Sequence, residues 1–176
     1  MGNMSFSKIE LRAEDKWSVV DLYRFFHALN ILYNRLYVFK RYYQDGFQQT
    51  TKCLWTSLYL VERGDELTID RLRMRSPAEF NLRGAGGIIK EVRELIKDIK
   101  YRNRIEEDTL LTELMRRKVS LMKEAGYTED ETREVIAIFL PPVRKMKKQM
   151  DKHDVSLISH EGPKEKARET TKLTHR

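Results

Sequence analysis

The sequence predicts an α+β protein in which a small antiparallel sheet of about three strands packs against long helices. Two short stretches alternate between apolar and polar residues, as half-buried strands do, while longer stretches repeat apolar residues every three or four positions, as helices do. Charged residues make up 35% of the chain, which is typical of long solvated helices. With 176 residues, we expect one helix-dominated domain with an extended C-terminal helical arm.

The first strand is predicted over residues 6–12. Ile9 and Leu11 fall on one face of such a strand, and Lys8, Glu10 and Arg12 fall on the other. This alternation indicates a strand with one face against the core.

A long helix is predicted to follow from Ser18, with Asp21 three residues later as a variant of the capping box. Its apolar residues recur at steps of three and four: Val19, Leu22, Phe26, Leu29, Leu32 or Tyr33, and Leu36. The opposite side also carries apolar residues, so this helix is either covered on two sides or offers a face to a partner. Asp45-Gly46 is the predicted end.

Residues 48–61 fit a short helix slightly better than a strand, and Arg63-Gly64-Asp65 indicates a turn. Residues 67–75 and 78–83 flank Ser76-Pro77 and predict a β-hairpin. The apolar phase slips within the first of these strands, which predicts a β-bulge near Asp70 and Arg71.

A glycine-rich corner, Gly84-Ala85-Gly86-Gly87, precedes the clearest amphipathic helix. Such a corner serves either a tight strand-to-helix connection or an anion at the helix start. Helix-forming residues continue to Ala125, so we expect one helix of up to about 40 residues, or roughly 60 Å.

The C-terminal part is predicted to begin with a helix at Thr128, where Glu131 completes a capping box. Pro141-Pro142 is expected to stop or kink this helix before a further short basic helix. No fixed structure is expected beyond about His153. The predicted organisation is an α+β domain with a long helical arm (1–125), C-terminal helices (126–152) and a basic tail (153–176).

Composition favours a cytoplasmic protein without a membrane span. Cys53 is the only thiol, no apolar leader follows Met1, and charged residues interrupt the richest apolar stretch, residues 17–39. The net charge is +7, and the segment from residue 144 onward has ten Lys or Arg against five Asp or Glu. A basic tail attracts nucleic acid, acidic proteins or anionic membranes without selecting among them.

Catalytic and metal-binding patterns are missing from the sequence. Three of the four histidines fall in the predicted tail, and His27 has no Cys or carboxylate at metal-ligand spacing. No serine, cysteine or lysine has the companions of an activated nucleophile. We therefore expect neither an enzyme nor a cofactor.

Basic residues form the most regular polar pattern and suggest nucleic-acid binding as an alternative function. Arginines alternate along the first hairpin strand, and a basic stripe repeats at steps of three and four on the following helix. This candidate groove comprises Arg71, Arg73, Arg75, Lys90, Arg93, Lys97, Lys100 and Arg104.

The hairpin, Phe80-x-Leu82-x-Gly84 and the following helix resemble a segment of short uncharacterised bacterial proteins, some of them linked to conflict or defence systems. The order of strand, long helix, two strands and helix also resembles the TRADD-N type of adaptor module. That resemblance implies a ferredoxin-like fold that works through protein contacts, and it carries over no catalytic residue.

The leading hypothesis is a non-enzymatic protein-interaction or oligomerisation module, such as an accessory or adaptor subunit of a bacterial defence-type complex. Its partner is expected to be a second copy or another protein, bound through helix pairing. The predicted interaction surface is apolar and comprises Leu110, Leu111, Leu114, Met115, Val119 and Met122. A nucleic-acid-binding accessory protein is the alternative.

Overall fold

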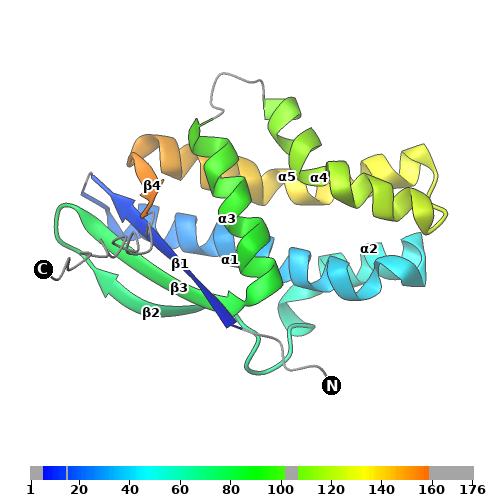
Figure 1. Ribbon diagram of the computed structural model, residues 1–176, viewed down its shortest axis with the longest axis horizontal. Coiled ribbons are helices and arrows are strands. Elements are labelled where there is room, and N and C mark those ends of the chain that lie inside the picture. The colour runs from blue at the N-terminus through cyan, green and yellow to red at the C-terminus, as the bar shows by residue number, and fades with distance from the viewer. Residues whose placement is uncertain (1–5, 15, 102–106, 159–176) are drawn as a thin grey trace, which may run out of the picture.

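The computed structural model describes residues 6–14, 16–101 and 107–158, and it confirms a helix-dominated α+β fold. Its sheet contains the strands β1 (Phe6–Ala13), β2 (Thr68–Arg73), β3 (Ala78–Ala85) and β4 (Val155–Leu157). The strand order is β2-β3-β1-β4, and all neighbouring pairs are antiparallel (Figure 1). With a helix after β1 and another after β3, this order is the split β-α-β arrangement of ferredoxin-like folds.

In the described ranges, five α-helices and two short 3₁₀ turns accompany the sheet. The helices are α1 (Val19–Tyr42), α2 (Phe47–Trp55), α3 (Gly86–Tyr101), α4 (Glu107–Glu124) and α5 (Glu129–Lys152), and the turns are η1 (Tyr43–Asp45) and η2 (Ser57–Tyr59). The caps predicted at Ser18 and Thr128 are both present. Within the described part of the chain, no helix has the length and apolar character needed to cross a membrane.

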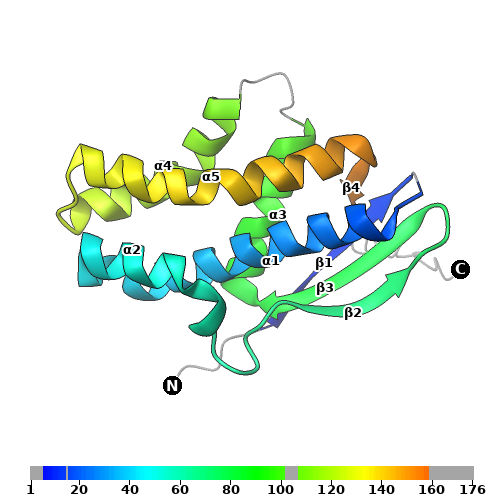
Figure 2. The ribbon, with the colours of Figure 1, turned by 180° about the vertical axis from the view of Figure 1, so that it is seen from behind.

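The core lies between one face of the sheet and the helices. Ile9 and Leu11 of β1 and Phe80 and Leu82 of β3 are buried, while their neighbours in sequence point away from the helices. The helices α1 and α5 lie side by side in both views (Figures 1 and 2). Their pairing extends the core well beyond the sheet.

The prediction of a single long helix over residues 86–125 is wrong, because this segment contains the two helices α3 and α4. Its first part, α3, packs on β1 and β4, whereas its second part, α4, runs in another direction and packs on α5 (Figure 1). Residues 102–106, which join them, lie outside the described ranges. The predicted arm is thus folded back onto the molecule, because α4 buries apolar side chains in the shared core.

Helix α5 continues through Pro141 and Pro142 to Lys152, so of the two alternatives, a stop or a kink, the stop is wrong, and no separate short helix follows in the described residues. A proline has no N–H, and Pro142 therefore leaves the carbonyl of Ile138, four residues earlier, without its helical donor. The guanidinium of Arg35, on α1, donates to this carbonyl. A neighbouring helix thus supplies the hydrogen bond that the proline removes.

Order extends past His153, contrary to the sequence prediction. Val155 is buried in β4, which pairs with Leu11, Arg12 and Ala13 of β1. His153 is itself buried, and its ring stacks on the indole of Trp17 at 4.1 Å between centroids. Among the residues that the structure describes, the sheet therefore has four strands rather than about three.

Candidate interaction surface

Strand β2 forms one edge of the sheet and is exposed along its whole length. Among the described strands it pairs with β3 alone, and all six of its residues are exposed. Figures 1 and 2 both show β2 at the margin of the molecule, with no described helix on its outer side. An edge strand of this kind leaves backbone N–H and C=O groups without sheet partners.

One face of β2 is apolar. Ile69 lies opposite Leu82 and Leu72 lies opposite Phe80, and since directly opposed residues share a face, both point to the helix side of the sheet. Even so, the exposed fractions are 48% for Ile69 and 42% for Leu72, and Met74 just beyond them is 50% exposed. The helices therefore cover the inner face of β3 but leave that of β2 largely in water.

The other face of β2 is basic. Arg71 lies opposite Asn81 and Arg73 lies opposite Glu79, both on the face that points away from the helices. The pairing register shifts between Ile69 and Arg71, which confirms the bulge predicted there. This bulge restores the phase, so that apolar and arginine side chains separate onto opposite faces.

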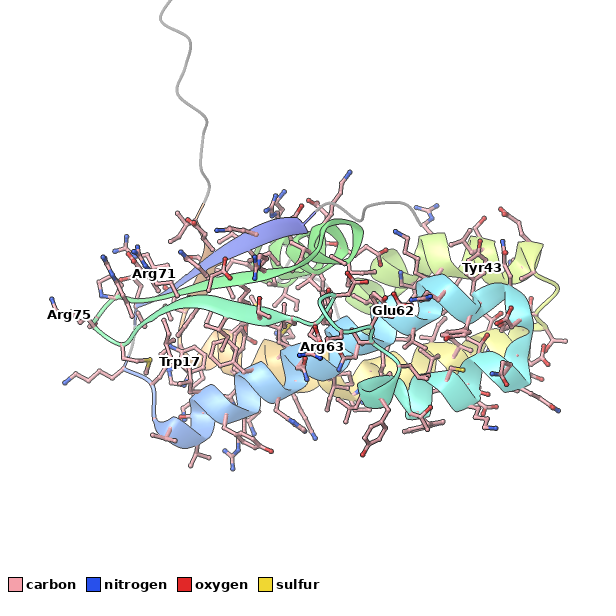
Figure 3. The ribbon with its side chains drawn as sticks, turned by 90° about the horizontal axis from the view of Figure 1, so that it is seen from below. Trp17, Tyr43, Glu62, Arg63, Arg71 and Arg75 are labelled. Carbon is pink, nitrogen blue, oxygen red and sulfur yellow. The ribbon has the colours of Figure 1, made fainter. Side chains whose placement is uncertain are left out.

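The arginines of this hairpin have few acidic neighbours. Arg73 has one weak ion pair, with Glu79 at 3.5 Å. Asp70, the acidic residue within β2, is shared by Lys8 at 3.1 Å and Arg83 at 3.4 Å. Arg71 and Arg75 form no ion pair with any residue that the structure describes, and Figure 3 shows Arg75 at the tip of the hairpin. Positive charge is thus left uncompensated along this edge.

Beneath the hairpin tip lies a hollow of about 230 Å³ lined by both apolar and basic side chains. Met74 and Arg75 line it from the hairpin, and Lys16 and Trp17 line it from the segment before α1. The apolar face of β2 therefore continues toward Trp17. We call Ile69, Leu72 and Met74, together with Arg71, Arg73 and Arg75, the β2 edge surface.

The far end of β3 is held by Tyr33 of α1. Its hydroxyl accepts the N–H of Ala85 at 2.8 Å and donates to the carbonyl of Asp65, and burial raises the pKa of Tyr33 to about 12. A Cβ atom on Gly84 would lie within 2.9 Å of the Tyr33 ring. The glycine corner is therefore explained by close packing, and one of its N–H groups is already occupied.

The predicted apolar surface on α4 lies partly inside the protein. Met115 and Met122 are fully buried and Val119 is packed against the core, so these three side chains cover this chain's own interior. The side chains of Leu110, Leu111 and Leu114 lie outside the described part of the structure. Among described residues, the exposed apolar groups are instead on β2, on the first turn of α1, and at Trp55, Leu58 and Tyr59.

The predicted basic groove is split between two places. Arg71 and Arg73 lie on the outer face of β2, whereas α3 packs on the inner face near β1, two strands away. On α3, Arg93 donates to the carbonyl of Lys8, Lys97 pairs with Glu94, and Lys100 pairs with Asp154. Lys90 is exposed, and Arg104 lies outside the described residues.

A different basic groove, of about 420 Å³, lies between α1 and α5 and was missed from the sequence. Arg24 and His27 line it from α1, and Lys145 and Lys148 line it from α5. The ring of Tyr23 stacks on His27 at 5.4 Å. The basic charge of the segment from residue 144 onward was visible in the sequence, but the groove itself depends on how the two helices pair.

The buried histidine belongs to a polar cluster at the start of α1. Asp21 accepts hydrogen bonds from Lys152 at 2.7 Å and Ser18 at 2.8 Å, and these bonds hold the pKa of Asp21 at about 2. Nε2 of His153 lies 3.4 Å from the same carboxylate. Across residues 6–14, 16–101 and 107–158, no three His, Cys, Asp or Glu side chains are arranged to hold a metal ion.

Comparison with known proteins adds no relative. Neither protein-family models, nor curated proteins, nor solved structures give a match to this chain. The class that fold and surface define is thus an α+β protein of split β-α-β topology with an open, amphipathic sheet edge.

Proposed function

We propose that this protein is a non-enzymatic protein-interaction module that contacts its partner through the β2 edge surface. The observation that carries the proposal is an exposed edge strand with half-exposed Ile69, Leu72 and Met74 on one face. Native proteins usually shorten or cover such edges, because an apolar edge is a template for another chain. An uncovered edge of this kind is typical of an interaction site.

The proposal places the partner on the β2 edge surface, whereas the helix-pairing hypothesis placed it on α4. Met115 and Met122 are part of the core and have no area to offer a partner. The β2 edge surface supplies both exposed apolar area and unpaired backbone groups, the two components of strand-mediated recognition. An accessory or adaptor role in a larger complex is consistent with such a surface.

Site-specific photo-crosslinking tests the proposal. A benzoylphenylalanine at Leu72 should yield crosslinked protein adducts in cells. The same group at Leu58, an apolar residue outside the β2 edge surface that is at least as exposed (53% against 42%), serves as the matched control. We expect adducts at position 72 that are lost on adding Arg71→Glu. Equal or absent adducts at the two positions would overturn the proposal.

Nucleic-acid binding is the second candidate, and the groove between α1 and α5 favours it. Lys145 and Lys148 form no ion pair with a described residue, and Tyr23 offers an aromatic ring for base stacking beside them. Binding here should weaken steeply between about 50 and 200 mM salt.

Double charge reversals in a labelled-oligonucleotide binding assay distinguish the groove between α1 and α5 from the basic residues of α3. Lys145→Glu with Lys148→Glu should abolish binding, whereas Arg93→Glu with Lys97→Glu should leave it nearly unchanged because both side chains are already engaged. Binding that survives the first pair would refute the groove as the nucleic-acid site.

A further inference from the structure

We infer that the β2 edge binds an extended segment of a partner protein in which apolar and acidic residues alternate, added to the sheet as a fifth strand. This inference rests on the proposed function and specifies the chemistry of the partner. It combines three properties of one strand: an unpaired backbone edge, an apolar face and an arginine face.

The backbone of β2 is suited to strand addition. Six residues of β2, with the bulge between Ile69 and Arg71, border the edge, compared with three residues in β4 at the opposite edge. A chain laid along β2 would satisfy the N–H and C=O groups that have no strand partner among the described residues. The short β4 offers room for only about one such pair of bonds.

The apolar face determines every second residue of the incoming segment. Side chains in a strand alternate between faces, so alternate partner residues would lie beside Ile69 and Leu72 on the helix side, and beyond them near Met74, which lines the hollow with Trp17. These three side chains are 42% to 50% exposed, and an apolar neighbour would remove that surface from water. The partner therefore needs apolar residues at alternate positions.

The arginine face determines the residues in between. They would lie beside Arg71 and Arg73, with Arg75 just beyond, and opposite charges across a strand pair are stabilising. Arg71 and Arg75 have no ion pair with a described residue, so they are available for carboxylates. Acidic residues at these positions match both the charge and the bidentate geometry of arginine.

The same charges argue against a second copy of this chain as the occupant. In an antiparallel pair of two β2 strands, the outer faces would bring Arg71 and Arg73 of one copy beside those of the other. Like charges directly opposed across a strand pair are destabilising. Charge complementarity thus selects an acidic partner over self-association.

Peptide binding to the full-length protein tests the inference. The probes are fluorescent ten-residue peptides in which valine alternates with glutamate or with lysine, followed by fluorescence anisotropy at low and moderate salt. We expect the glutamate peptide to bind at least about ten-fold more tightly than the lysine peptide. Equal affinity would overturn the acidic specificity.

A charge exchange locates the binding site. Arg71→Glu with Arg73→Glu should reverse the preference in favour of the lysine peptide. The matched control is Lys90→Glu with Lys123→Glu, which changes the net charge equally at exposed positions on α3 and α4 and should keep the original preference. Circular dichroism confirms that both variants remain folded. If both variants behave alike, β2 is not the site.

A backbone-modified probe separates strand addition from simple charge attraction. The glutamate peptide N-methylated at every second residue keeps its charge but loses N–H donors on one edge, and methylation in the phase that faces β2 should abolish binding. Retained binding in both phases would overturn strand addition. If peptides fail while crosslinks at Leu72 persist, the partner chemistry is wrong and the proposed function stands; if both fail, both are wrong.

Discussion

At Gly84, the absence of a side chain is required by the neighbouring tyrosine. A Cβ atom there would lie 2.7 Å from the hydroxyl oxygen and 2.8 and 2.9 Å from two ring carbons of Tyr33. The ring cannot move away freely, because its hydroxyl is hydrogen-bonded to the N–H of Ala85 and the carbonyl of Asp65. The end of β3 and the start of α3 are therefore positioned by one aromatic side chain.

We predict that Gly84→Ala lowers the free energy of unfolding by about 1–3 kcal/mol, the usual cost of overpacking a core. The control is Gly87→Ala, where the added Cβ would meet only the mobile end of Lys40 and alanine is the better helix former. Urea denaturation should show Gly87→Ala within about 0.5 kcal/mol of the wild type. Equal destabilisation by the two substitutions would contradict the close-packing explanation.

Asp21 links protonation to stability. The Lys152 and Ser18 hydrogen bonds lower its pKa to about 2, below the value of 3.8 expected in the unfolded chain. A carboxylate with a depressed pKa stabilises the fold fully above the unfolded value and loses that contribution as the pH falls toward the folded value. Its effect should therefore disappear between about pH 4 and pH 2.

Urea denaturation of the wild type and of Asp21→Asn over that interval measures the effect. The variant should be less stable near neutral pH, and its stability should fall less steeply below pH 4. Asp130→Asn, at an exposed carboxylate in the first turn of α5, should keep the wild-type slope. Parallel slopes for wild type and Asp21→Asn would show that Asp21 is not the group responsible.

Among the elements, α1 and α5 are coupled by the hydrogen bond from Arg35 to Ile138. Because Pro142 removes the helical donor to this carbonyl, Pro142→Ala should make Arg35 partly redundant. A charged hydrogen bond contributes about 1.5–3 kcal/mol. The coupling is thus measurable in a double-mutant cycle.

We predict that Arg35→Met is less destabilising by about 1 kcal/mol in the Pro142→Ala background than in the wild type. Pro141→Ala is the control, since the carbonyl four residues before it belongs to Ala137 and does not accept from Arg35. Denaturant unfolding gives all the required free energies. An equal coupling free energy of Arg35→Met with Pro142→Ala and with Pro141→Ala would contradict the explanation that Arg35 replaces the hydrogen bond that Pro142 removes.

Local patterns were sufficient to predict several elements. The alternation of apolar and polar residues predicted β1 and the hairpin, and the shift in that alternation predicted the bulge. The capping residues predicted where α1 and α5 begin. Elements that depend on distant residues were missed. Three residues of β4 are too few for a periodic signal, and its pairing with β1 joins segments more than 140 residues apart.

At the scale of the whole molecule, surfaces were harder to predict than elements. The apolar pattern on α4 was predicted to contact a partner, but α5 and the core cover Met115 and Met122 within the same chain. The arginine alternation on β2 was visible in the sequence. That no described helix covers this strand follows only from the tertiary arrangement, and so the candidate interaction surface emerged from the fold.

Amide hydrogen exchange in the purified protein tests the open β2 edge most directly. With light scattering used to confirm a monomer, residues 68–73 should exchange at least about ten-fold faster than residues 78–85 of β3, because about half of the edge amides have no strand partner. This result would establish an accessible edge in the free protein. Protection of β2 equal to that of β3 in the monomer would contradict it, since the edge would then already be occupied.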